Sequence, residues 1–302
     1  MSTTTGRTGA EATGRVGDEP HPRPRSSTRA RTTLLLGYVV LLVFSVIYLY
    51  PFLVQIATAF KTDADAVGDP LSLVPDPFTT AALDRLREAD FPLWALNSTI
   101  VAVLVTAGRV FFNSLAGYAL ARIKFKGRDA VFTAVLAVLA VPGVILLIPK
   151  FLVLNQLGIY DTYPALIVPL LVDAAGVFIM KQFFESIPVS VEESARIDGA
   201  STFRVFWSVV LPMAKPALIT VTILSFQGSW NELPHFIVAS SDRDLYTLTK
   251  GVANLTSGQL GSGQQYPVTM MAALLMTIPV AIVFIVFQRY FVRGGTAGAE
   301  KG

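Results

Sequence analysis

The chain has no cysteine and only two histidines among its 302 residues. The lack of cysteine excludes disulfide scaffolds, cysteine metal sites and thiol nucleophiles. His21 lies in a polar N-terminal tail and His235 lies near the end of an apolar segment, so no histidine metal site or catalytic triad is expected. The phosphate-binding pattern G-x-x-x-x-G-K-S/T is missing as well. These absences predict that the chain is not an enzyme and binds no cofactor or metal of its own.

Charged residues are also scarce, at 15% of the chain, whereas 53% of the residues are hydrophobic and the mean hydropathy is +0.57. A soluble protein of this length is rarely so apolar. Six continuous apolar runs are each long enough to cross a hydrocarbon core of roughly 30 Å, which takes about 20 helical residues. The expected spans are residues 34–57, 96–118, 130–150, 164–183, 216–238 and 268–291. Because the runs lack the alternation of barrel strands, the predicted fold class is all-α, in a polytopic membrane protein.

Lysine and arginine are unevenly distributed between the spans. Of the 24 basic residues, 17 lie in the N-terminal tail, after the second span, around the loop between the fourth and fifth spans, or near the C-terminus, and six lie in the alternate connections. Because cytoplasmic segments are enriched in basic residues, both termini and the loop at residues 188–212 are predicted to be cytoplasmic. Residues 1–33 lack apolar periodicity and are expected to form a disordered tail. A transmembrane domain at residues 34–293 and a short C-terminal tail at residues 294–302 complete the predicted organisation.

The charged loop between the fourth and fifth spans is predicted to contain two short helices. Ser190 and Glu193 have the spacing of a capping box. Glu192 and Arg196 are one helical turn apart, with the acid first, as in a surface ion pair. Gly199 can end the first helix because glycine readily adopts the left-handed conformation.

The second helix of the loop is expected to be capped by Ser201 or Thr202. Its apolar face would carry Phe203, Phe206 and Val210, with Trp207 beside them, and Pro212 would end it. On periodicity alone, an amphipathic loop lying on the membrane surface explains the pattern equally well.

Two charged residues fall inside the expected spans, Arg109 in the second and Asp173 in the fourth. Charges in hydrocarbon are costly, so they are usually paired or hydrated. The two residues therefore either pair across the bundle interior or line a hydrated path. Pro142 and Pro279 lie deep in the third and sixth spans, where each can kink its helix because proline removes one backbone hydrogen bond.

The run Trp230-Asn231-Glu232 lies toward the outer end of the fifth span. Trp230 suits an anchor at the membrane interface. Alternatively, it offers an aromatic surface to a sugar ring, with Asn231 and Glu232 forming hydrogen bonds with hydroxyl groups. Two longer segments, residues 61–92 and 240–266, are expected on the same outer side, either as connectors or as contacts for an external partner.

The charged loop also has a more specific pattern. Glu193-Ser194-Ala195 is followed after three residues by Gly199, after nine more by Val209, and after one more by Leu211-Pro212. This spacing resembles the EAA loop of bacterial ABC importer permeases, with Ser194 in place of an alanine and Val209 in place of an isoleucine. Both replacements are similar in size to the family residue. In that family the loop is a coupling helix, which docks into a cleft of a cytoplasmic ATPase subunit.

Further motifs extend the resemblance from about residue 34 to the end of the chain. They are similar to motifs of the MalG-type permeases of carbohydrate ABC importers, and they comprise Asn97-Ser98, Ala119-Leu120-Ala121-Arg122, Phe125-Lys126-Gly127-Arg128, Ile148-Pro149, Phe183-Phe184, Ile187-Pro188, Trp230-Asn231-Glu232 and the ending at residues 295–302. That short ending is typical of the MalG-like half of such importers rather than of its MalF-like partner.

The resemblance implies a permease subunit in the bacterial plasma membrane that forms half of the translocation pathway of an ATP-driven sugar importer. Its implied partners are a second, MalF-like permease, two copies of a cytoplasmic ATPase that bind ATP and Mg, an extracellular or periplasmic sugar-binding protein, and the sugar; nucleic acid is not among them. The implied residues of coupling to the ATPase are Glu192, Glu193, Ser194, Ala195, Arg196, Asp198, Gly199, Leu211 and Pro212. The C-terminal Gly298, Lys301 and Gly302 would also reach toward the ATPase.

A self-sufficient secondary transporter or channel is the alternative. Such a protein would also have six spans and polar residues at depth. It would have no need for the pattern between Glu193 and Pro212, which therefore favours the importer subunit.

Overall fold

The computed structural model describes the backbone of residues 28–256 and 265–299 and the side chains of residues 32–255 and 265–288. All regular elements in these ranges are helical, which confirms the all-α prediction for the described residues. The chain divides into two compact units, Met1–Pro51 and Phe52–Gly302, and each is described by itself.

The first unit contains most of α1 (Thr28–Ala59), an apolar helix of 32 residues. The helix begins before residue 34, where the first span was predicted. Its large apolar side chains are exposed, Leu42 by 65% and Tyr48 by 72%. A helix that is apolar on all sides needs lipid or other protein around it, so α1 suits a membrane span.

The second unit holds the end of α1 and all later elements. Their bounds are α2 (Asp63–Gly68), α3 (Ala81–Glu88), α4 (Phe91–Arg122), α5 (Arg128–Leu139), η1 (Gly143–Leu146), α6 (Leu147–Gln156), α7 (Tyr163–Ile167), η2 (Val168–Leu170), α8 (Ala174–Ser186), α9 (Val189–Ile197), α10 (Thr202–Val205), η3 (Phe206–Val210), α11 (Leu211–Met213), α12 (Lys215–Trp230), α13 (Pro234–Ala239), η4 (Arg243–Leu245), α14 (Leu248–Thr256) and α15 (Tyr266–Ala299).

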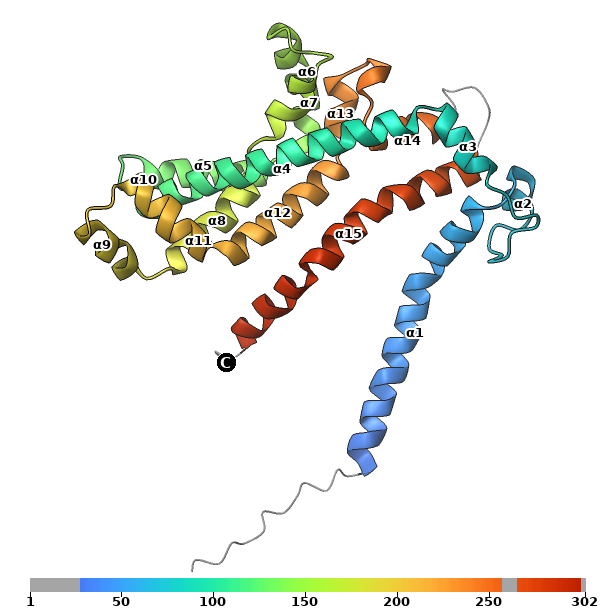
Figure 1. Cartoon of the computed structure of the whole chain (residues 1–302), viewed down its shortest axis with the longest axis horizontal. Helices are drawn as coiled ribbons and strands as arrows, with labels where there is room; N and C mark the ends of the chain where they lie inside the picture. Colours follow the sequence, from blue (N-terminus) through green and yellow to red (C-terminus); the bar gives the residue numbers. More distant parts are fainter. Residues whose placement is uncertain (1–27, 257–264, 300–302) are drawn as a thin grey trace, which may run out of the picture. The chain divides into compact units, whose positions relative to one another are not determined.

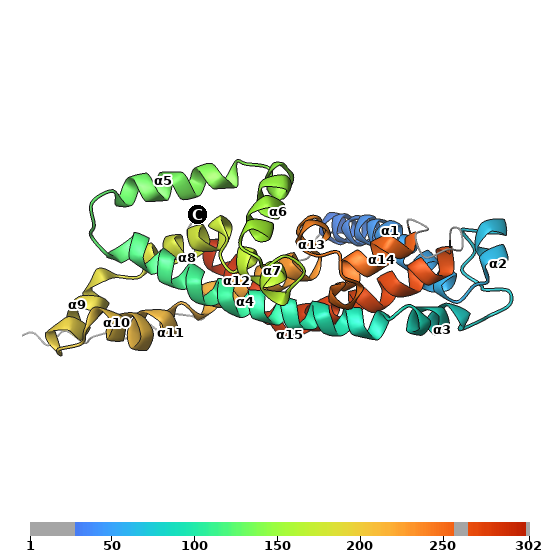
Figure 2. The same ribbon diagram turned by 90° about the horizontal axis from the view of Figure 1, so that it is seen from above.

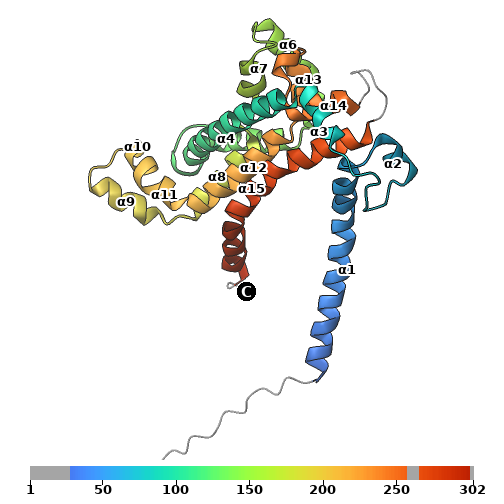
Figure 3. The same cartoon turned by 45° about the vertical axis from the view of Figure 1, so that its right-hand side comes forward.

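Helix α4 is the centre of this unit. It packs along both α8 and α12, and α12 also contacts α15 (Figure 1). The buried residues of α4 include Val101, Ala102 and Val105 toward its start. Near its end, Tyr118 joins an apolar cluster with Phe184 of α8. Helices α9 to α11 lie by the end of α4, and α14 lies by its start (Figure 3).

The number of membrane-crossing helices depends on how bent segments are counted. Within the residues that the structure describes, Thr32–Ala59, Phe91–Arg122, Tyr163–Ser186 and Tyr266–Gln288 are each long and apolar enough to cross a membrane. Two bent pairs raise the number from four to six if each is one span: Arg128–Leu139 with Gly143–Gln156 at 99°, and Thr202–Met213 with Lys215–Trp230 at 80°.

Proline explains where one of these segments breaks. The predicted third span bends between α5 and α6 (Figure 2), and Pro142 lies in the break, directly before η1. Pro279, in contrast, lies inside α15, which is helical from Tyr266 to Ala299. Residues 294–299 of the predicted C-terminal tail are therefore helical and continue α15, and residues 300–302 lie outside the described residues.

The predicted fifth span is also two elements. Helix α12 ends at Trp230, and Pro234 opens the separate short helix α13. Proline at the first turn of a helix cannot donate a hydrogen bond to the preceding turn, so the helix that ends at Trp230 does not run on through residue 238.

Helices α4 and α8 approach closely at Gly117. A Cβ atom there would lie 2.7 Å from Met180 Cβ and 2.9 Å from Lys181 N, so a side chain forces the helices apart. We expect Gly117→Ala to lower the free energy of unfolding by about 1–3 kcal/mol, as overpacking does in other cores. Thermal unfolding of the purified protein in detergent measures this loss. The control is Gly37→Ala in α1, where a Cβ would meet open space; equal unfolding temperatures for the two variants would contradict the prediction.

Candidate functional site

The first helix of the charged loop is α9, whose N-cap is Pro188. Ser190 therefore lies inside the first turn, where its carbonyl oxygen accepts a hydrogen bond from Ser194 Oγ at 2.9 Å. The predicted capping box of Ser190 and Glu193 is wrong. The helix instead starts at Val189, directly after Pro188, which occupies the N-cap with φ −58° and ψ 131° and has no side-chain donor or acceptor to cap it.

The end of α9 follows the prediction. Gly199 has a φ of +82°, the left-handed conformation expected of it, and its N–H donates to Arg196 O at 3.0 Å. Ser201 rather than Thr202 then caps α10, because its Oγ accepts a hydrogen bond from Arg204 N at 3.4 Å. A sharp corner between two helices results.

The apolar residues after this corner do not share one face. Phe206 and Val210 are buried together with Val205. Phe203 and Trp207 are 67% and 51% exposed, and their rings stack on each other. Phe203 lies in α10, and Phe206 and Val210 are the first and last residues of the π-helix that follows it. The predicted face is therefore right for Phe206 and Val210 and wrong for Phe203.

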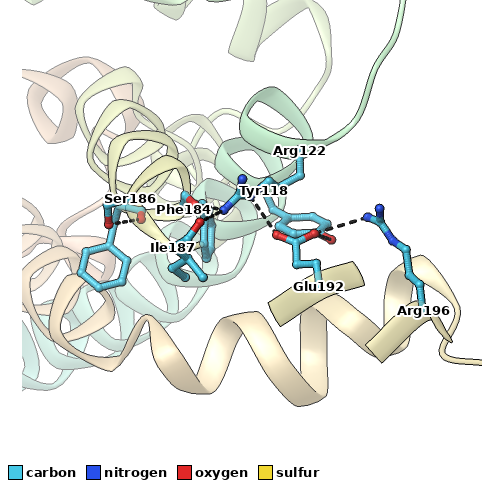
Figure 4. Close-up of polar contacts among 8 residues, drawn as sticks. Tyr118, Arg122, Phe184, Ser186, Ile187, Glu192 and Arg196 are labelled. Atoms are coloured by element: carbon cyan, nitrogen blue, oxygen red, sulfur yellow. Dashed lines mark hydrogen bonds and ion pairs between the residues drawn. The ribbon is translucent and has the colours of Figure 1, made fainter. Parts of the chain in front are cut away.

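Glu192 is the feature on which the loop is built. The prediction of a surface ion pair with Arg196 is half right, since Arg196 Nη2 lies 3.3 Å from Glu192 Oε2. Glu192 itself, however, is only 1% exposed and points from α9 toward α4 (Figure 4). There its carboxylate forms an ion pair with Arg122, with Nε 2.8 Å from Oε1, and accepts a hydrogen bond from the Tyr118 hydroxyl at 3.2 Å.

Arg122 joins three elements at this point. Its guanidinium lies at the end of α4, pairs with Glu192 of α9, and donates to the carbonyl oxygens of Phe184 and Ile187 at the end of α8. The bond to Phe184 O is 2.6 Å long. The last carbonyl groups of a helix have no hydrogen-bond partner within the helix. A cation at this end can take that role as a donor, and it also interacts favourably with the negative end of the helix dipole. The sequence marked Arg122 as a basic residue of this side and as the end of a family motif, but not as the partner of Glu192, and it gave no signal for Tyr118.

The residues expected to couple to an ATPase separate into two sets. Besides Glu192, Ala195 and Leu211 pack against the apolar cluster beneath the loop. The other members are exposed, namely Glu193, Ser194, Arg196, Asp198, Gly199 and Pro212. Ile197, which the pattern had not singled out, is 86% exposed and is a large apolar side chain on the same helix. The loop thus has an inner side that is buried against the helices and an outer side that is exposed. Gly298 lies in the last turns of α15, and Lys301 and Gly302 lie outside the described residues.

Arg109 and Asp173, the charged pair inside the predicted spans, lie together. Arg109 Nε is 3.6 Å from Asp173 Oδ2 and donates to Leu170 O at 2.7 Å. Asn113, which the sequence did not suggest, completes the group: its Nδ2 donates to Asp173 Oδ2 at 2.9 Å and its Oδ1 accepts from Asp173 N at 3.2 Å. Asp173 also caps α8 by accepting from Gly176 N at 2.7 Å.

Of the run Trp230-Asn231-Glu232, only Asn231 presents an exposed side chain. Trp230 is 4% exposed, stacks on Phe226, and donates from Nε1 to Met276 O of α15 at 3.1 Å. Glu232 Oε1 accepts a hydrogen bond from His235 N, in the first turn of α13, at 2.9 Å. The buried Trp230 ring therefore packs α12 against α15, which disfavours its use as a surface for a sugar.

The segment after α13 is held by Asp161, which lies between α6 and α7. Its carboxylate accepts hydrogen bonds from Ser241 Oγ at 2.9 Å and Asp242 N at 3.0 Å. Burial alone would raise the pKa of Asp161, but these hydrogen bonds outweigh it and hold the pKa below its usual value. Burial lowers the pKa of Lys250 in α14, which donates to the carbonyl oxygens of Phe236 and Ser240.

Among the described residues, no three histidine or carboxylate side chains gather in a way that could hold a metal ion. The helices and their apolar surfaces define an integral membrane protein with a structured polar loop between two of its apolar segments.

Comparison with known proteins names the family. Residues 113–294, more than half of the chain, match the family of the binding-protein-dependent transport system inner membrane component, and the chain belongs to that family. The resemblance drawn from the loop spacing is thereby confirmed.

Individual relatives agree with this membership. The chain is 31% identical over 282 residues to the arabinooligosaccharides transport system permease protein AraQ of Halalkalibacterium halodurans, covering 91% of this chain and all of the relative. It is 32% identical to the inner membrane ABC transporter permease protein YcjP of Escherichia coli, with the same coverage of both chains. Among solved structures, it matches a chain of a bacterial ABC transporter involved in the import of the acidic polysaccharide alginate, with a TM-score of 0.74, 26% identity, and coverage of 89% of this chain and all of that one.

Removal of one partner from the Arg122–Glu192 pair should leave the other as a buried charge without a counter-charge. We expect Glu192→Gln to lower the free energy of unfolding by about 3–5 kcal/mol. The matched control is Glu193→Gln, which neutralises the next residue on the exposed side of α9 and should be close to neutral. Thermal unfolding in detergent compares them. If the two variants unfold at the same temperature, the buried pair does not stabilise the loop.

Substitutions of Asp173 can separate its charge from its capping role. Asn is as good an N-cap as Asp, so Asp173→Asn keeps the cap and leaves Arg109 without its counter-charge, at an expected loss of about 1–3 kcal/mol. Asp173→Ala loses the cap as well, which should add about 1 kcal/mol. Unfolding temperatures of the two variants test this, and a wild-type value for Asp173→Asn would show that the ion pair contributes nothing.

Proposed function

We propose that this chain is the transmembrane permease subunit of an ATP-driven saccharide importer, in which it forms half of the translocation pathway. In this proposal α9 is the coupling helix. An ATPase subunit binds its exposed side, and the chain itself hydrolyses no ATP.

The observation that carries the proposal is the division of α9 into two sides. Glu192 fixes one side to α4 and α8 through Arg122. The opposite side exposes Glu193 and the large apolar side chain of Ile197. An exposed apolar residue beside charged ones is typical of a protein interface. A push on this side would move α4 and α8 with the loop, because a buried ion pair and two backbone hydrogen bonds join them.

The same arrangement suggests how ATP drives the pathway. The ATPase subunits have two conformations, one with ATP bound and one without it. Because α9 is rigidly held to the membrane helices, each conformation of the ATPase would favour a different access state of the pathway. The coupling needs no flexible element at α9. It needs the opposite, a helix that cannot tilt independently of α4.

The proposed substrate class is a saccharide or a small sugar derivative. Relatives of this length include permeases named for arabinooligosaccharides, and another, from Yersinia pestis, is named for sn-glycerol-3-phosphate, at 30% identity over 85% of this chain and 94% of the relative. The described residues do not favour Trp230 as a stacking surface, so the contacts that select the sugar are proposed to lie largely in the partner permease.

The proposed assembly has a MalF-like permease beside this chain, two ATPase copies that bind ATP and Mg on the cytoplasmic side, and a sugar-binding protein on the outer side. The distribution of basic residues supports the orientation, with both termini and α9 in the cytoplasm of a bacterial cell. Gly298, Lys301 and Gly302 would extend toward the ATPase.

A self-sufficient secondary transporter remains the alternative. It would use the Arg109–Asp173 pair as part of an ion pathway. The full set of partners around that pair, which includes Asn113 and the Leu170 carbonyl, favours a structural role instead.

The experiment is a pull-down of the detergent-solubilised chain, with identification of the subunits that copurify. Gly199→Val should reduce recovery of the ATPase at least tenfold while the second permease is still recovered, because a β-branched residue tolerates a φ of +82° poorly and the corner after α9 is lost. Gly199→Asn is the matched control, since asparagine adopts this conformation more readily, and should retain the ATPase.

Glu193→Ala tests the exposed side of α9 without changing the backbone, and it should also weaken ATPase recovery. Recovery of the chain alone, together with wild-type saccharide uptake in Gly199→Val and Glu193→Ala cells, would support the secondary transporter and contradict the importer subunit.

A further inference from the structure

The short connection between α4 and α5 lies next to the Arg122–Glu192 ion pair, which holds α9 in place and is called the loop anchor below. It comprises residues 123–127 and directly follows Arg122, the partner of Glu192. The helix before it is a candidate span, Phe91–Arg122, and the helix after it opens the bent pair that starts at Arg128. A connection of five residues between two such segments has to lie at the membrane surface, on the same side as α9.

Basic and apolar residues alternate along this connection. Lys124 and Lys126 are exposed, and Ile123 and Phe125 between them are 40% and 42% exposed. Ile123 has an extended backbone, with φ −88° and ψ 128°, and successive side chains of an extended segment point to opposite sides. Two exposed apolar side chains and two exposed cations thus alternate along the connection, as suits a segment at the boundary between hydrocarbon and headgroups.

A tight turn brings a third cation to the same place. Arg128 N donates to Phe125 O, and Gly127 in the third position of the turn has φ 86° and ψ 7°, the values of a type II turn. Residues 124–130 line a hollow of about 610 Å³. Arg128 Nε lies 3.4 Å from Asp129 Oδ1, whereas Lys124 and Lys126 make no ion pair within the part of the chain that the structure describes.

We propose that this hollow binds the phosphate of an anionic phospholipid headgroup, such as that of phosphatidylglycerol, through Lys124, Lys126 and Arg128. Lysine provides compact point charges and arginine a planar pair of donors, which together suit a phosphate. The position at the end of two spans places these cations at headgroup depth, where basic residues are attracted by anionic lipid. The exposed Ile123 and Phe125 favour lipid over a soluble acidic protein, which would leave both in water.

The site has a consequence for the loop anchor. A headgroup held at Lys124 fixes the backbone directly after Arg122 and so stabilises the position of the guanidinium that holds Glu192. The lipid site depends on the membrane placement of the chain and not on the saccharide or on the ATPase, so it can fail while the proposed function stands.

The test is native mass spectrometry of the full chain, with the subunits that copurify, in nanodiscs of phosphatidylcholine containing a fraction of phosphatidylglycerol. The variant is Lys124→Gln/Lys126→Gln. The matched control is Arg204→Gln/Lys215→Gln, which removes two exposed cations from α10 and α12 near the same end of α4. We expect the apparent affinity for phosphatidylglycerol to fall roughly tenfold to thirtyfold in the variant and to stay near the wild-type value in the control.

Three outcomes would overturn the proposal. The first is equal retention of phosphatidylglycerol by the wild type and both double variants. The second is complete displacement of the lipid by millimolar soluble glycerol phosphate, which would indicate a small-anion site. The third is found if Lys124→Gln/Lys126→Gln retains the lipid but loses the copurified ATPase, while the control double variant keeps both. That result would assign these cations to a protein interface.

Discussion

The ion pair between Arg122 and Glu192 is the interaction on which the arrangement of the loop depends. A glutamate that is 1% exposed would be strongly disfavoured without a counter-charge, and Arg122 Nε is 2.8 Å away. The same guanidinium also satisfies the last carbonyls of α8. An apolar contact of similar area would hold α9 as firmly, but it would leave the angle of the helix free. Fixed donors and acceptors on three elements define that angle, as the proposed coupling role of α9 would require.

The polar groups inside the bundle follow the same rule as the loop anchor. Arg109 and Asp173 are joined by Asn113 and by the Leu170 carbonyl, and Asp173 is at the same time the N-cap of α8. A break in the helix exposes backbone groups that a bilayer cannot satisfy, so a side chain has to reach them. The break between η2 and α8 thus explains why an aspartate occurs in an otherwise apolar segment. Its charge then accounts for the arginine on the neighbouring helix.

Much of this organisation could be predicted from the sequence, and the failures have identifiable causes. The hydrophobic runs predicted the all-α class correctly, because a membrane helix is apolar along nearly its whole length and is therefore easy to recognise in a sequence. The conformation of Gly199 and the cap at Ser201 follow from chemistry within one turn of the chain. The inward direction of Glu192 could not be predicted, since Tyr118 and Arg122 are about 70 residues away from it in the sequence. The mistaken face at Phe203 has a local cause, since Phe203 is about one helical turn from both Phe206 and Trp207, and its ring stacks on the exposed Trp207.

The apolar lining of a cavity among the helices bears on whether this chain could move a saccharide without a partner. A cavity of about 580 Å³ lies between α4, η3, α12 and α15, and its lining is almost entirely apolar, with Thr106, Ser114 and Thr222 among its few polar side chains. Moving a saccharide past such a surface would leave its hydroxyl groups without hydrogen-bond partners, at a cost of several kcal/mol. We infer that the polar wall of a saccharide pathway has to come from another chain. The surface of α4 and α12 would then be the complementary apolar side, which supports the partner permease of the proposed function.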